Sequence, residues 1–258
     1  MNLRKTIEGL ITAPVDSRGE IPLEMGGRSL MLYPRSPVAV GRTLLFMGHG
    51  TPGRRLYVVS PLQDPLAARF EGTCLRWAAE GEDQVRRCRL VPANAAVIRD
   101  LFDWTRPRPL GLADSFGLGD RLGIAGPAPL RAMAGSGFEV VLAQQSIREL
   151  ERTERTPDEV MDAATCAVFQ EGWRTGFGAD ADHLKTTDEI DAFVDAGHTF
   201  FTIDSGDHMD PGADDANSVQ LEKKVAALPW KTLQSTAEDL VFGLTRRPLE
   251  LDGFNAVS

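Results

Sequence analysis

The sequence has few cysteines and few histidines, the residue types that mark disulfide-rich, zinc-binding and redox proteins. Its 258 residues include three cysteines and four histidines. The cysteines, Cys74, Cys88 and Cys166, are widely spaced, and no pair has the CxxC spacing of a zinc knuckle or a redox motif. Scattered thiols are typical of a reducing compartment, so we expect a cytoplasmic protein whose cysteines are structural.

Long hydrophobic runs and an excess of positive charge are absent as well. No run reaches the roughly 18 apolar residues that a membrane-spanning helix needs, and the first residues lack the apolar core of a secretory signal. Lys and Arg together number 28 against 37 Asp and Glu, which gives a net charge of -9. An acidic chain without a basic cluster is poorly suited to nucleic acid or a membrane surface, so we expect neither as a partner.

The remaining composition is that of a folded globular protein, with 42% hydrophobic and 25% charged residues. The sequence pattern changes near residue 105. Residues 1–105 contain short apolar segments separated by Gly, Pro, Arg and Asp, which predicts a small β-rich α/β region. Within this region, Gly48-His49-Gly50 indicates a turn.

Residues 110–258 alternate between apolar segments and helix-start signals. Residues 139–143 and 199–204 are typical of strands buried on both faces. The capping boxes that begin at Thr156 and Thr186 predict two helix starts. This alternation predicts a parallel sheet, either closed as a barrel or doubly wound. A dinucleotide-binding fold is disfavoured, because no Gly-x-Gly-x-x-Gly opens a helix after a first strand.

Polar residues follow the apolar segments of this second region. They are residues 144–149 (QQSIRE) after one strand, residues 180–185 (DADHLK) after the next, and residues 204–208 (DSGDH) after the third. The carboxyl ends of parallel strands meet at one edge of the sheet, where α/β proteins build their sites. Carboxylate and imidazole groups at such an edge can bind a divalent cation or move protons.

The histidines of this region have different expected roles. Neighbours on an extended strand point to opposite sides, so Asp182 and His183 should act separately unless one of them twists at the loop. His198 precedes a strand, away from the predicted site, and is expected to be structural. His208 either caps a helix or joins the site, and the sequence leaves both open.

Several blocks of this region resemble one known family. They are residues 115–123 (SFGLGDRLG), 143–149 (AQQSIRE), 156–161 (TPDEVM), 169–173 (FQEGW), 176–185 (GFGADADHLK) and 199–204 (TFFTID). In this order and at these intervals they resemble the tagaturonate/fructuronate epimerase family. The resemblance implies TIM-barrel-like βα units, here a partial barrel over residues 110–258, because members of that family are nearly twice this long.

The resemblance also implies a metal-dependent isomerase that interconverts D-fructuronate and D-tagaturonate by inverting C4. Asp182 is similar to the family's catalytic acid/base, and Glu149 to a second site carboxylate near the metal. His183 is similar to a ligand of the divalent cation, which would be Mn, Zn, Ni or Co. Ser146 and Thr202 correspond to substrate-lining positions, and Gln145, Lys185 and Asp204 complete the predicted substrate-binding set.

The chemistry of the expected reaction leaves alternatives open. The hydrogen at C4 is not acidified by the ketone, so we expect deprotonation of the C4 hydroxyl, retro-aldol cleavage of C3–C4 and re-addition. Transient oxidation at C4 would need a nicotinamide, for which there is no fingerprint. Lys185, Arg148 and Arg121 are candidate partners for the sugar carboxylate.

Two other functions fit the sequence. One is another metal-dependent sugar aldolase or isomerase on the same barrel. The other is an inactive half-domain that binds a sugar acid or a partner chain. Half a barrel has two unpaired edge strands, which favours a homo-oligomer or pairing with the missing C-terminal half.

Overall fold

The structure, a computed structural model, describes residues 3–12, 19–25, 27–75, 83–245, 249–251 and 254–256. The chain divides into two compact units, Met1–Asp204 and Ser205–Ser258. The first unit contains two sheets, one antiparallel and one parallel, and therefore continues across the predicted boundary near residue 105. The mixed α/β class predicted from the sequence is confirmed.

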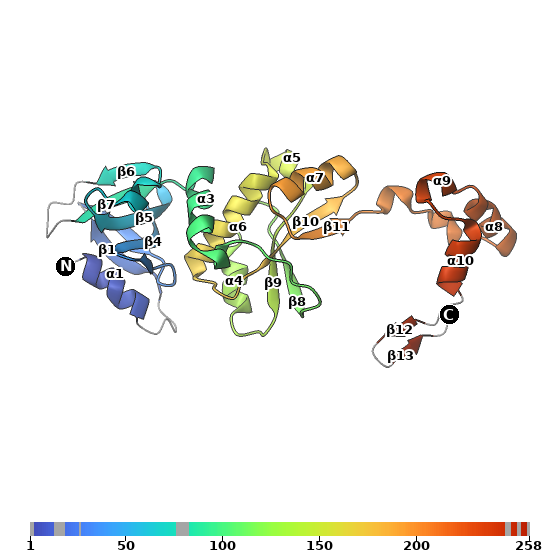
Figure 1. Cartoon of the computed structure of the whole chain (residues 1–258), viewed down its shortest axis with the longest axis horizontal. Helices are drawn as coiled ribbons and strands as arrows, with labels where there is room; N and C mark the ends of the chain where they lie inside the picture. Colours follow the sequence, from blue (N-terminus) through green and yellow to red (C-terminus); the bar gives the residue numbers. More distant parts are fainter. Residues whose placement is uncertain are drawn as a thin grey trace. The chain divides into compact units, whose positions relative to one another are not determined.

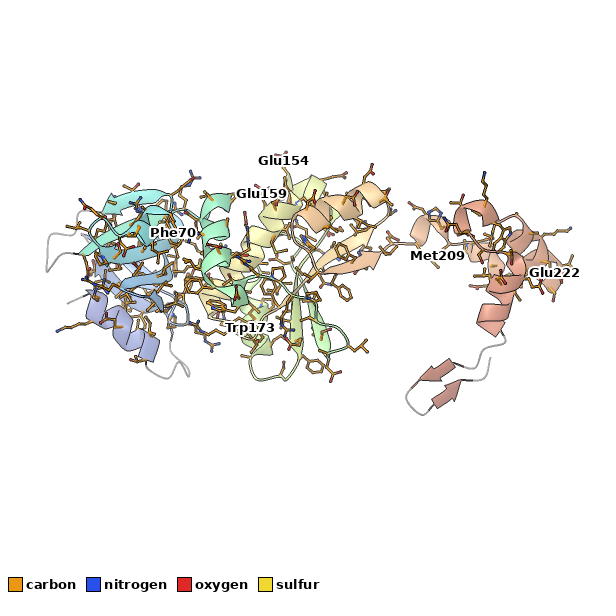
Figure 2. All side chains as sticks on the ribbon, viewed as in Figure 1. Phe70, Glu154, Glu159, Trp173, Met209 and Glu222 are labelled. Atoms are coloured by element: carbon orange, nitrogen blue, oxygen red, sulfur yellow. The ribbon has the colours of Figure 1, made fainter. Side chains whose placement is uncertain are left out.

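The antiparallel sheet has seven strands in the order β1-β2-β4-β5-β7-β6, with β3 paired to β4 (Figure 1). Its elements are α1 (Leu3–Thr12), β1 (Ile21–Met25), β2 (Arg28–Leu32), β3 (Val38–Val40), β4 (Thr43–Gly50), β5 (Gly53–Pro61), α2 (Pro65–Ala68), β6 (Gly72–Leu75) and β7 (Asp83–Cys88). One face packs on Leu3 and Ile7 of α1, and the other forms a core with Phe70, whose side chain is labelled in Figure 2.

The prediction of a turn at Gly48-His49-Gly50 is wrong, because these residues end β4 and the turn follows at residues 51–52. Glycine is needed at position 48 because β2 passes close to the backbone of β4 there. A Cβ on Gly48 would lie 2.8 Å from the Met31 carbonyl oxygen and 2.9 Å from Leu30 Cδ1. Glycine in a strand often marks such a close approach of backbone, which the local sequence does not distinguish from a turn.

The parallel sheet has four strands in the order β11-β10-β9-β8, so neighbouring strands are also consecutive along the chain. Its elements are α3 (Pro92–Leu101), a 3-10 turn (Asp103–Thr105), β8 (Ser115–Gly119), α4 (Pro127–Met133), β9 (Glu139–Ser146), α5 (Ile147–Thr153), α6 (Pro157–Glu171), β10 (Gly178–Leu184), α7 (Thr187–Asp195) and β11 (Phe200–Ile203). The four described strands form an open sheet, and the predicted TIM-barrel-like arrangement is not confirmed.

Helix α6 joins the cores of the two sheets (Figure 1). Ala167 and Val168 pack in the core of the parallel sheet, whereas Cys166 and Phe169 pack in a core of the antiparallel sheet. The helix begins as the sequence predicts, with a Thr156 capping box and Pro157 in the first turn. It is therefore buried on two sides, which explains why most of its residues are inaccessible to solvent.

The cysteines are unpaired, as expected for structural thiols. Cys88 and Cys166 are buried and Cys74 is exposed. Burial raises the pKa of the Cys88 and Cys166 thiols to about 12, because an apolar environment disfavours the thiolate. Neither buried thiol is therefore a nucleophile at neutral pH.

The second unit consists of short helices and a hairpin. Its elements are two 3-10 turns (Gly206–His208 and Pro211–Ala213), α8 (Ser218–Ala226), α9 (Trp230–Leu233), α10 (Ala237–Thr245), β12 (Leu249–Leu251) and β13 (Phe254–Ala256). None of its described side chains is buried, and Met209 is 71% exposed (Figure 2). His208 lies in the first of these turns. Across the described ranges of both units, we find no helix long and apolar enough to cross a membrane.

Candidate active site

A hydrogen-bonded network lies on the face of the parallel sheet opposite its helices. Ala179 and Ala181 pack in the core beneath the helices, so Asp180 and Asp182, which alternate with them along β10, face the other way. The Asp180 carboxylate accepts a hydrogen bond from Gln144 Nε2 at 2.8 Å and from Thr202 Oγ1 at 3.0 Å. The network thus links β9, β10 and β11 next to Asp182.

Asp180 is fully buried, and the loss of hydration raises the pKa of its carboxyl group above the usual range. The donors Gln144 and Thr202 act against this shift, because they stabilise the ionised form. Asp180 and Gln144 lie in the predicted polar clusters, but no site role was predicted for either. The signal was available for Asp180, because a residue two positions before Asp182 on a strand lies on the same face.

A local distortion decides which of the two neighbouring glutamines reaches this face. Ala143 has a left-handed φ of 59°, and the pairing register between β9 and β10 shifts beside it. Such a bulge re-aims the side chains that follow. Gln144 consequently reaches Asp180, whereas Gln145 is completely buried and bonds to the Arg121 carbonyl oxygen and the Arg155 guanidinium. The structure therefore does not bring Gln145 to the other predicted site residues.

Asp182 and His183 lie in direct contact at the carboxyl end of β10. Asp182 Oδ1 is 2.7 Å from His183 Nδ1, and the side chains are 20% and 60% exposed. His183 has a left-handed φ of 57°, which breaks the alternation of the extended strand. Of the two expected arrangements, the structure has the one in which a residue twists at the loop. Backbone strain at a non-glycine residue is common at functional sites, where the surrounding structure holds it.

The contact also defines the chemistry open to the His183 ring. A carboxylate on one nitrogen of a histidine orients the ring and leaves the second nitrogen for a ligand or a proton. With Nδ1 engaged by Asp182, Nε2 is the nitrogen left for that purpose. The pair can therefore act as a proton-transfer dyad or as part of a ligand set.

Ser146 and Glu149 form the capping box of α5. The Glu149 carboxylate accepts hydrogen bonds from the Ser146 backbone N–H and hydroxyl group. The bond from the hydroxyl group is the main reason why the pKa of Glu149 is lowered, and Arg121 and Arg148 add smaller effects. Their nitrogens lie 3.9 Å from Glu149 Oε1. This carboxylate is a weak base with a structural task, as its Ser-x-x-Glu spacing could have indicated.

Lys185 and Asp204 pair with each other at the ends of β10 and β11. Lys185 Nζ lies 3.7 Å from Asp204 Oδ2, and the Asp204 backbone N–H donates to the Leu184 carbonyl oxygen. The Lys185 backbone N–H donates to Glu189 at the start of α7. Both predicted substrate-binding residues therefore lie at the predicted end of the sheet, next to the Asp182–His183 contact.

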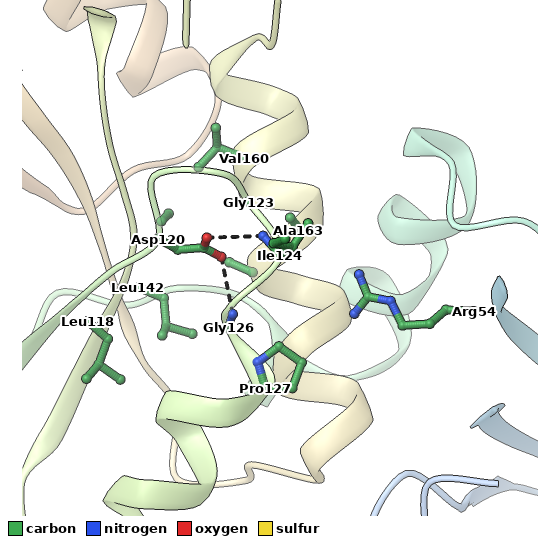
Figure 3. A pocket seen from close by; sticks show the side chains of 12 residues that line it. Arg54, Leu118, Asp120, Gly123, Ile124, Gly126, Pro127, Leu142, Val160 and Ala163 are labelled. Atoms are coloured by element: carbon green, nitrogen blue, oxygen red, sulfur yellow. Dashed lines mark hydrogen bonds between the residues drawn. The ribbon is translucent and has the colours of Figure 1, made fainter. Parts of the chain in front are cut away.

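The loop between β8 and α4 is organised by Asp120. Its carboxylate accepts from the backbone N–H groups of Ile124 (3.1 Å), Ala125 (2.8 Å) and Gly126 (3.2 Å). The loop borders a small pocket of about 20 Å³, room for about one water molecule, that Leu142, Val160 and Arg54 also line (Figure 3). Leu142 and Val160 belong to the core beneath the helices, so this cavity lies on the other side of the sheet from Asp182.

The described residues do not by themselves complete a divalent-metal site. Within the described ranges, no group of three or more His, Cys, Asp or Glu side chains is arranged to hold a metal ion. Catalytic zinc sites typically use three protein ligands, whereas the contact between Asp182 and His183 supplies two donors. We therefore derive no chemical step through a metal from these residues.

His198 lies in the core beside α7, as the structural expectation requires. It is 5% exposed, and its ring meets the Phe193 ring edge-on, with centroids 4.7 Å apart. Its Nδ1 lies 3.2 Å from the Phe193 carbonyl oxygen, and no described residue bonds its Nε2. Burial lowers the pKa of this imidazole to about 4, because the charged form loses its hydration.

The buried imidazole of His198 should make stability depend on pH. An unfolded histidine takes up a proton near pH 6.5, but folded His198 does so only near pH 4. The unfolded state thus binds more protons between these values, and stability falls as the pH drops through this window. From pH 7.5 to pH 5 we expect the wild type to lose about 2 kcal/mol more than His198→Phe, as measured by urea unfolding. Equal losses in the two proteins would contradict this assignment.

Comparison with known proteins identifies the family. A family model described as tagaturonate epimerase matches residues 33–245, which include both sheets of the first unit from β3 onward and most of the second unit. The chain belongs to the tagaturonate epimerase family. The resemblance predicted from the sequence blocks is thereby confirmed.

Two relatives of this tagaturonate epimerase family member illustrate the match. The tagaturonate/fructuronate epimerase of Thermotoga maritima is 49% identical over 122 residues, which are 47% of this chain and 25% of that protein. The native crystal structure of the fructuronate-tagaturonate epimerase UxaE from Cohnella laeviribosi is 33% identical, with a TM-score of 0.71 over 89% of this chain. A glycerol complex of the same enzyme also has a TM-score of 0.71. The chain spans 44% of the Cohnella protein, less than half its length.

Proposed function

We propose that this chain supplies one half of the active site of a tagaturonate/fructuronate epimerase. The observation that carries the proposal is the contact between Asp182 and His183, formed by a left-handed residue at the end of β10. This contact lies inside the region that matches the family model. The substrate class follows from the names of the relatives, which are epimerases of fructuronate and tagaturonate.

In the proposed reaction, Asp182 is the acid/base at the C4 hydroxyl group. Asp182 takes the proton of the C4 hydroxyl group, and the C3–C4 bond breaks. The electron pair of that bond remains on the C1–C3 fragment, which becomes an enediolate, while C4 becomes the aldehyde of the C4–C6 fragment. The C4 aldehyde rotates, the enediolate attacks its other face, and C3–C4 re-forms with the inverted configuration. Asp182 then returns the proton to the new alkoxide, so no external redox partner is needed. The partial exposure of Asp182, at 20%, supports access of a sugar hydroxyl to this carboxylate.

His183 is the proposed ligand of a divalent cation, which would be Mn, Zn, Ni or Co. Such a cation would supply Lewis-acid stabilisation of the enediolate. The remaining ligands would come from residues outside the described ranges or outside this chain. Asp180, through its bonds to Gln144 and Thr202, would keep the three strand ends in register under the site. Glu149 would keep α5 in place as its cap.

The sugar acid is the proposed small-molecule partner, and its carboxylate needs a cation. Lys185 lies nearest in chain position to the dyad and is held toward the sheet edge by Asp204. Arg121 and Arg148 are the alternatives, and both lie near Glu149. Ser146, Thr202 and Asp204 complete the substrate-binding set at the same strand ends. The acidic chain supports the absence of nucleic-acid and membrane partners, and the unpaired thiols support a cytoplasmic location.

The parallel sheet is proposed to be part of a TIM-barrel-like domain. Consecutive parallel strands in chain order, with helices on one face, are the arrangement that barrels repeat. The open edge strand β11 carries Phe200 and Ile203, which are 50% and 62% exposed. Such an edge needs a partner, so we include in the proposal either further strands from a C-terminal half or a homo-oligomer.

A chimera tests the proposal without requiring this chain to be active alone. Residues 106–204 would replace the corresponding segment of the Thermotoga maritima epimerase. We expect the chimera to interconvert fructuronate and tagaturonate, as followed by NMR, because the segment supplies the dyad and its supporting network. A folded chimera that binds the sugar acid but leaves both sugars unchanged would contradict the catalytic role.

A second candidate function is a half-domain that binds a sugar acid or a partner chain without turnover. It is favoured by the lack of a three-ligand group among the described residues and by the coverage of 44% of the solved relative. The same chimera distinguishes the two functions, because a binding half-domain would not support catalysis. Another metal-dependent sugar aldolase or isomerase would show turnover with a phosphorylated ketose instead.

A further inference from the structure

Three polar side chains and one glycine form a row across the four strands of the parallel sheet. Gly117 lies on β8, Gln144 on β9, Asp180 on β10 and Thr202 on β11. The Asp180 carboxylate accepts a hydrogen bond from Gln144 Nε2 at 2.8 Å and from Thr202 Oγ1 at 3.0 Å. Asp180 is fully buried, so these donors cover it. This face of the sheet therefore presents Gln144 and Thr202, and not the charge beneath them.

The Gln144 side-chain amide has only one orientation that suits Asp180. An amide nitrogen donates and an amide oxygen accepts, so the NH2 group must face the carboxylate. Gln144 Oε1 then points elsewhere. Among the residues that the structure describes, none donates to Gln144 Oε1, and this oxygen is not one of the buried atoms that lack a partner. The hydrogen bond to Asp180 thus holds an accessible acceptor in a fixed place.

Glycine at position 117 makes room for this amide. A Cβ on Gly117 would lie 2.8 Å from both Nε2 and Oε1 of Gln144 and 3.1 Å from its Cδ. The φ of Gly117 is not left-handed, so its backbone conformation is open to other residues. The missing side chain at position 117 therefore matters for the place of the Gln144 amide and not for the course of the chain.

The Gln144 acceptor lies on the same face as Asp182, the proposed acid/base. The register between β9 and β10 pairs Asp182 with Ser146, two residues beyond Gln144. Two residues along a strand correspond to roughly 6–7 Å. A hexuronate chain is long enough to span this separation, and it carries hydroxyl groups on neighbouring carbons. A sugar acid whose C4 hydroxyl group reaches Asp182 can therefore place a neighbouring hydroxyl group at Gln144.

We propose that Gln144 is a substrate-binding residue whose amide oxygen accepts a hydrogen bond from the C5 hydroxyl group of the sugar acid, with Gly117 as its positioning residue. This inference rests on the proposed epimerase function. In that reaction Asp182 serves the C4 hydroxyl group and the C3 oxygen becomes part of the enediolate. The C5 hydroxyl group is the neighbour that stays unchanged. A hydrogen bond at C5 keeps the C4–C6 fragment in place while its aldehyde rotates about the C4–C5 bond.

Steady-state kinetics of the chimera that carries residues 106–204 tests this role. Gln144→Met keeps a side chain of similar length but removes the acceptor. It should raise KM for fructuronate about tenfold, because one hydrogen bond to the substrate is lost. The value of kcat should stay within about threefold, because the C5 hydroxyl group is bound alike before and during cleavage. Isothermal titration calorimetry with the equilibrated sugar acids should show the same loss of affinity.

The analogue 5-deoxyfructuronate identifies the hydroxyl group that Gln144 binds. The parent chimera should bind this analogue about tenfold more weakly than fructuronate, because Gln144 Oε1 then lacks its donor. Gln144→Met should bind the two compounds with equal affinity, since the partner of the C5 hydroxyl group is already gone. If Gln144→Met also lost tenfold on the analogue, the C5 hydroxyl group would have another partner and the assignment would be wrong.

Gly117→Ala tests the positioning without removing the acceptor. The added methyl group takes the place of the Gln144 amide, so KM should rise about as much as in Gln144→Met. The double variant should be no weaker than Gln144→Met alone, because both substitutions remove one contact. Additive losses would show that Gly117 acts on something other than Gln144.

Gln170→Met is the matched control. It removes a buried, hydrogen-bonded amide from the same segment, but Gln170 lies on α6, which packs against the other face of the sheet. We expect the KM of the parent chimera, and circular dichroism checks that each variant is folded. A folded Gln144→Met chimera with parental KM and affinity would overturn the inference. If Gln144→Met does not fold, equal affinities of the parent for fructuronate and its 5-deoxy analogue would overturn it.

The same measurements separate this inference from the proposed function. A parent chimera that binds the sugar acids without turnover contradicts the epimerase reaction, whereas a tenfold loss of affinity in Gln144→Met would still support the contact. A parent chimera that turns over while Gln144→Met keeps its KM contradicts only the role of Gln144. A parent chimera that neither binds nor converts the sugar acids contradicts both.

Discussion

Replacing Asp182 by asparagine in the chimera should lower turnover by about 10²- to 10⁴-fold, the usual contribution of a positioned acid/base. Asparagine has nearly the same shape and can still accept a hydrogen bond, but it cannot take a proton from the C4 hydroxyl group. The 2.7 Å contact with His183 should persist through the amide oxygen, so the ring stays oriented. The rate of fructuronate conversion, measured by NMR at saturating substrate, gives the effect.

Asp191→Asn in the same chimera is the control for this substitution. Asp191 is an exposed residue of α7 in the same segment, and its replacement removes the same charge without touching the strand ends. We expect turnover within about twofold of the parent chimera, because solvent and salt screen the charge of an exposed side chain. If Asp182→Asn also kept parental turnover, Asp182 would not be the acid/base, and the retro-aldol route would need another residue at C4.

Replacing Phe169 by alanine should destabilise the first unit by about 3–5 kcal/mol. Phe169 is completely buried in α6 and stacks on Trp104, with ring centroids 5.9 Å apart and planes at 12°. Phe102 completes the aromatic cluster at 5.8 Å. The substitution leaves a cavity at the helix shared by both sheets, and rigid neighbours on either side limit its collapse. Urea unfolding followed by circular dichroism measures the loss.

Phe200→Ala provides the comparison for this loss. The Phe200→Ala substitution removes the same number of atoms, but from a side chain of β11 that is 50% exposed. We therefore expect the free energy of unfolding to fall by less than about 1.5 kcal/mol. Because α6 belongs to both cores, we expect Phe169→Ala to lower the urea midpoint of both sheets together, in a single unfolding transition of the first unit. A Phe169→Ala protein as stable as Phe200→Ala would show that α6 does not couple the two sheets.

Local sequence signals determined the order of elements in the second half of the first unit. The capping boxes at Thr156 and Thr186 fix the starts of α6 and α7, because the side-chain hydrogen bonds that cap a helix come from residues three positions apart. The continuous apolar run at residues 139–143 likewise indicated β9, and the polar residues that follow the predicted strands indicated the edge at which a site would be built. These features depend on residues that are only a few positions apart in the chain, so they can be predicted from the sequence alone.

The prediction was less accurate where the contact partner lies far away in the chain. A turn at Gly48 was the natural interpretation of its neighbours, but Leu30 and Met31 of β2 are what require glycine there. The site role of Glu149, implied by the family resemblance, stays a prediction; the structure shows its carboxylate in the capping box of α5. Closure of the parallel sheet into a barrel depends on strands beyond the four described, and the structure does not test it.

The sequence by itself determined that a polar cluster, including Asp182 and His183, follows buried strands of a parallel sheet, because alternation and apolar runs encode burial. Only the tertiary structure decided that these two side chains meet, and that Gln144 rather than Gln145 reaches Asp180. Left-handed residues at His183 and Ala143 cause both outcomes. Left-handed conformations are unfavourable for these residues and are held by the packing of the surrounding strands. They therefore cannot be predicted from the local sequence.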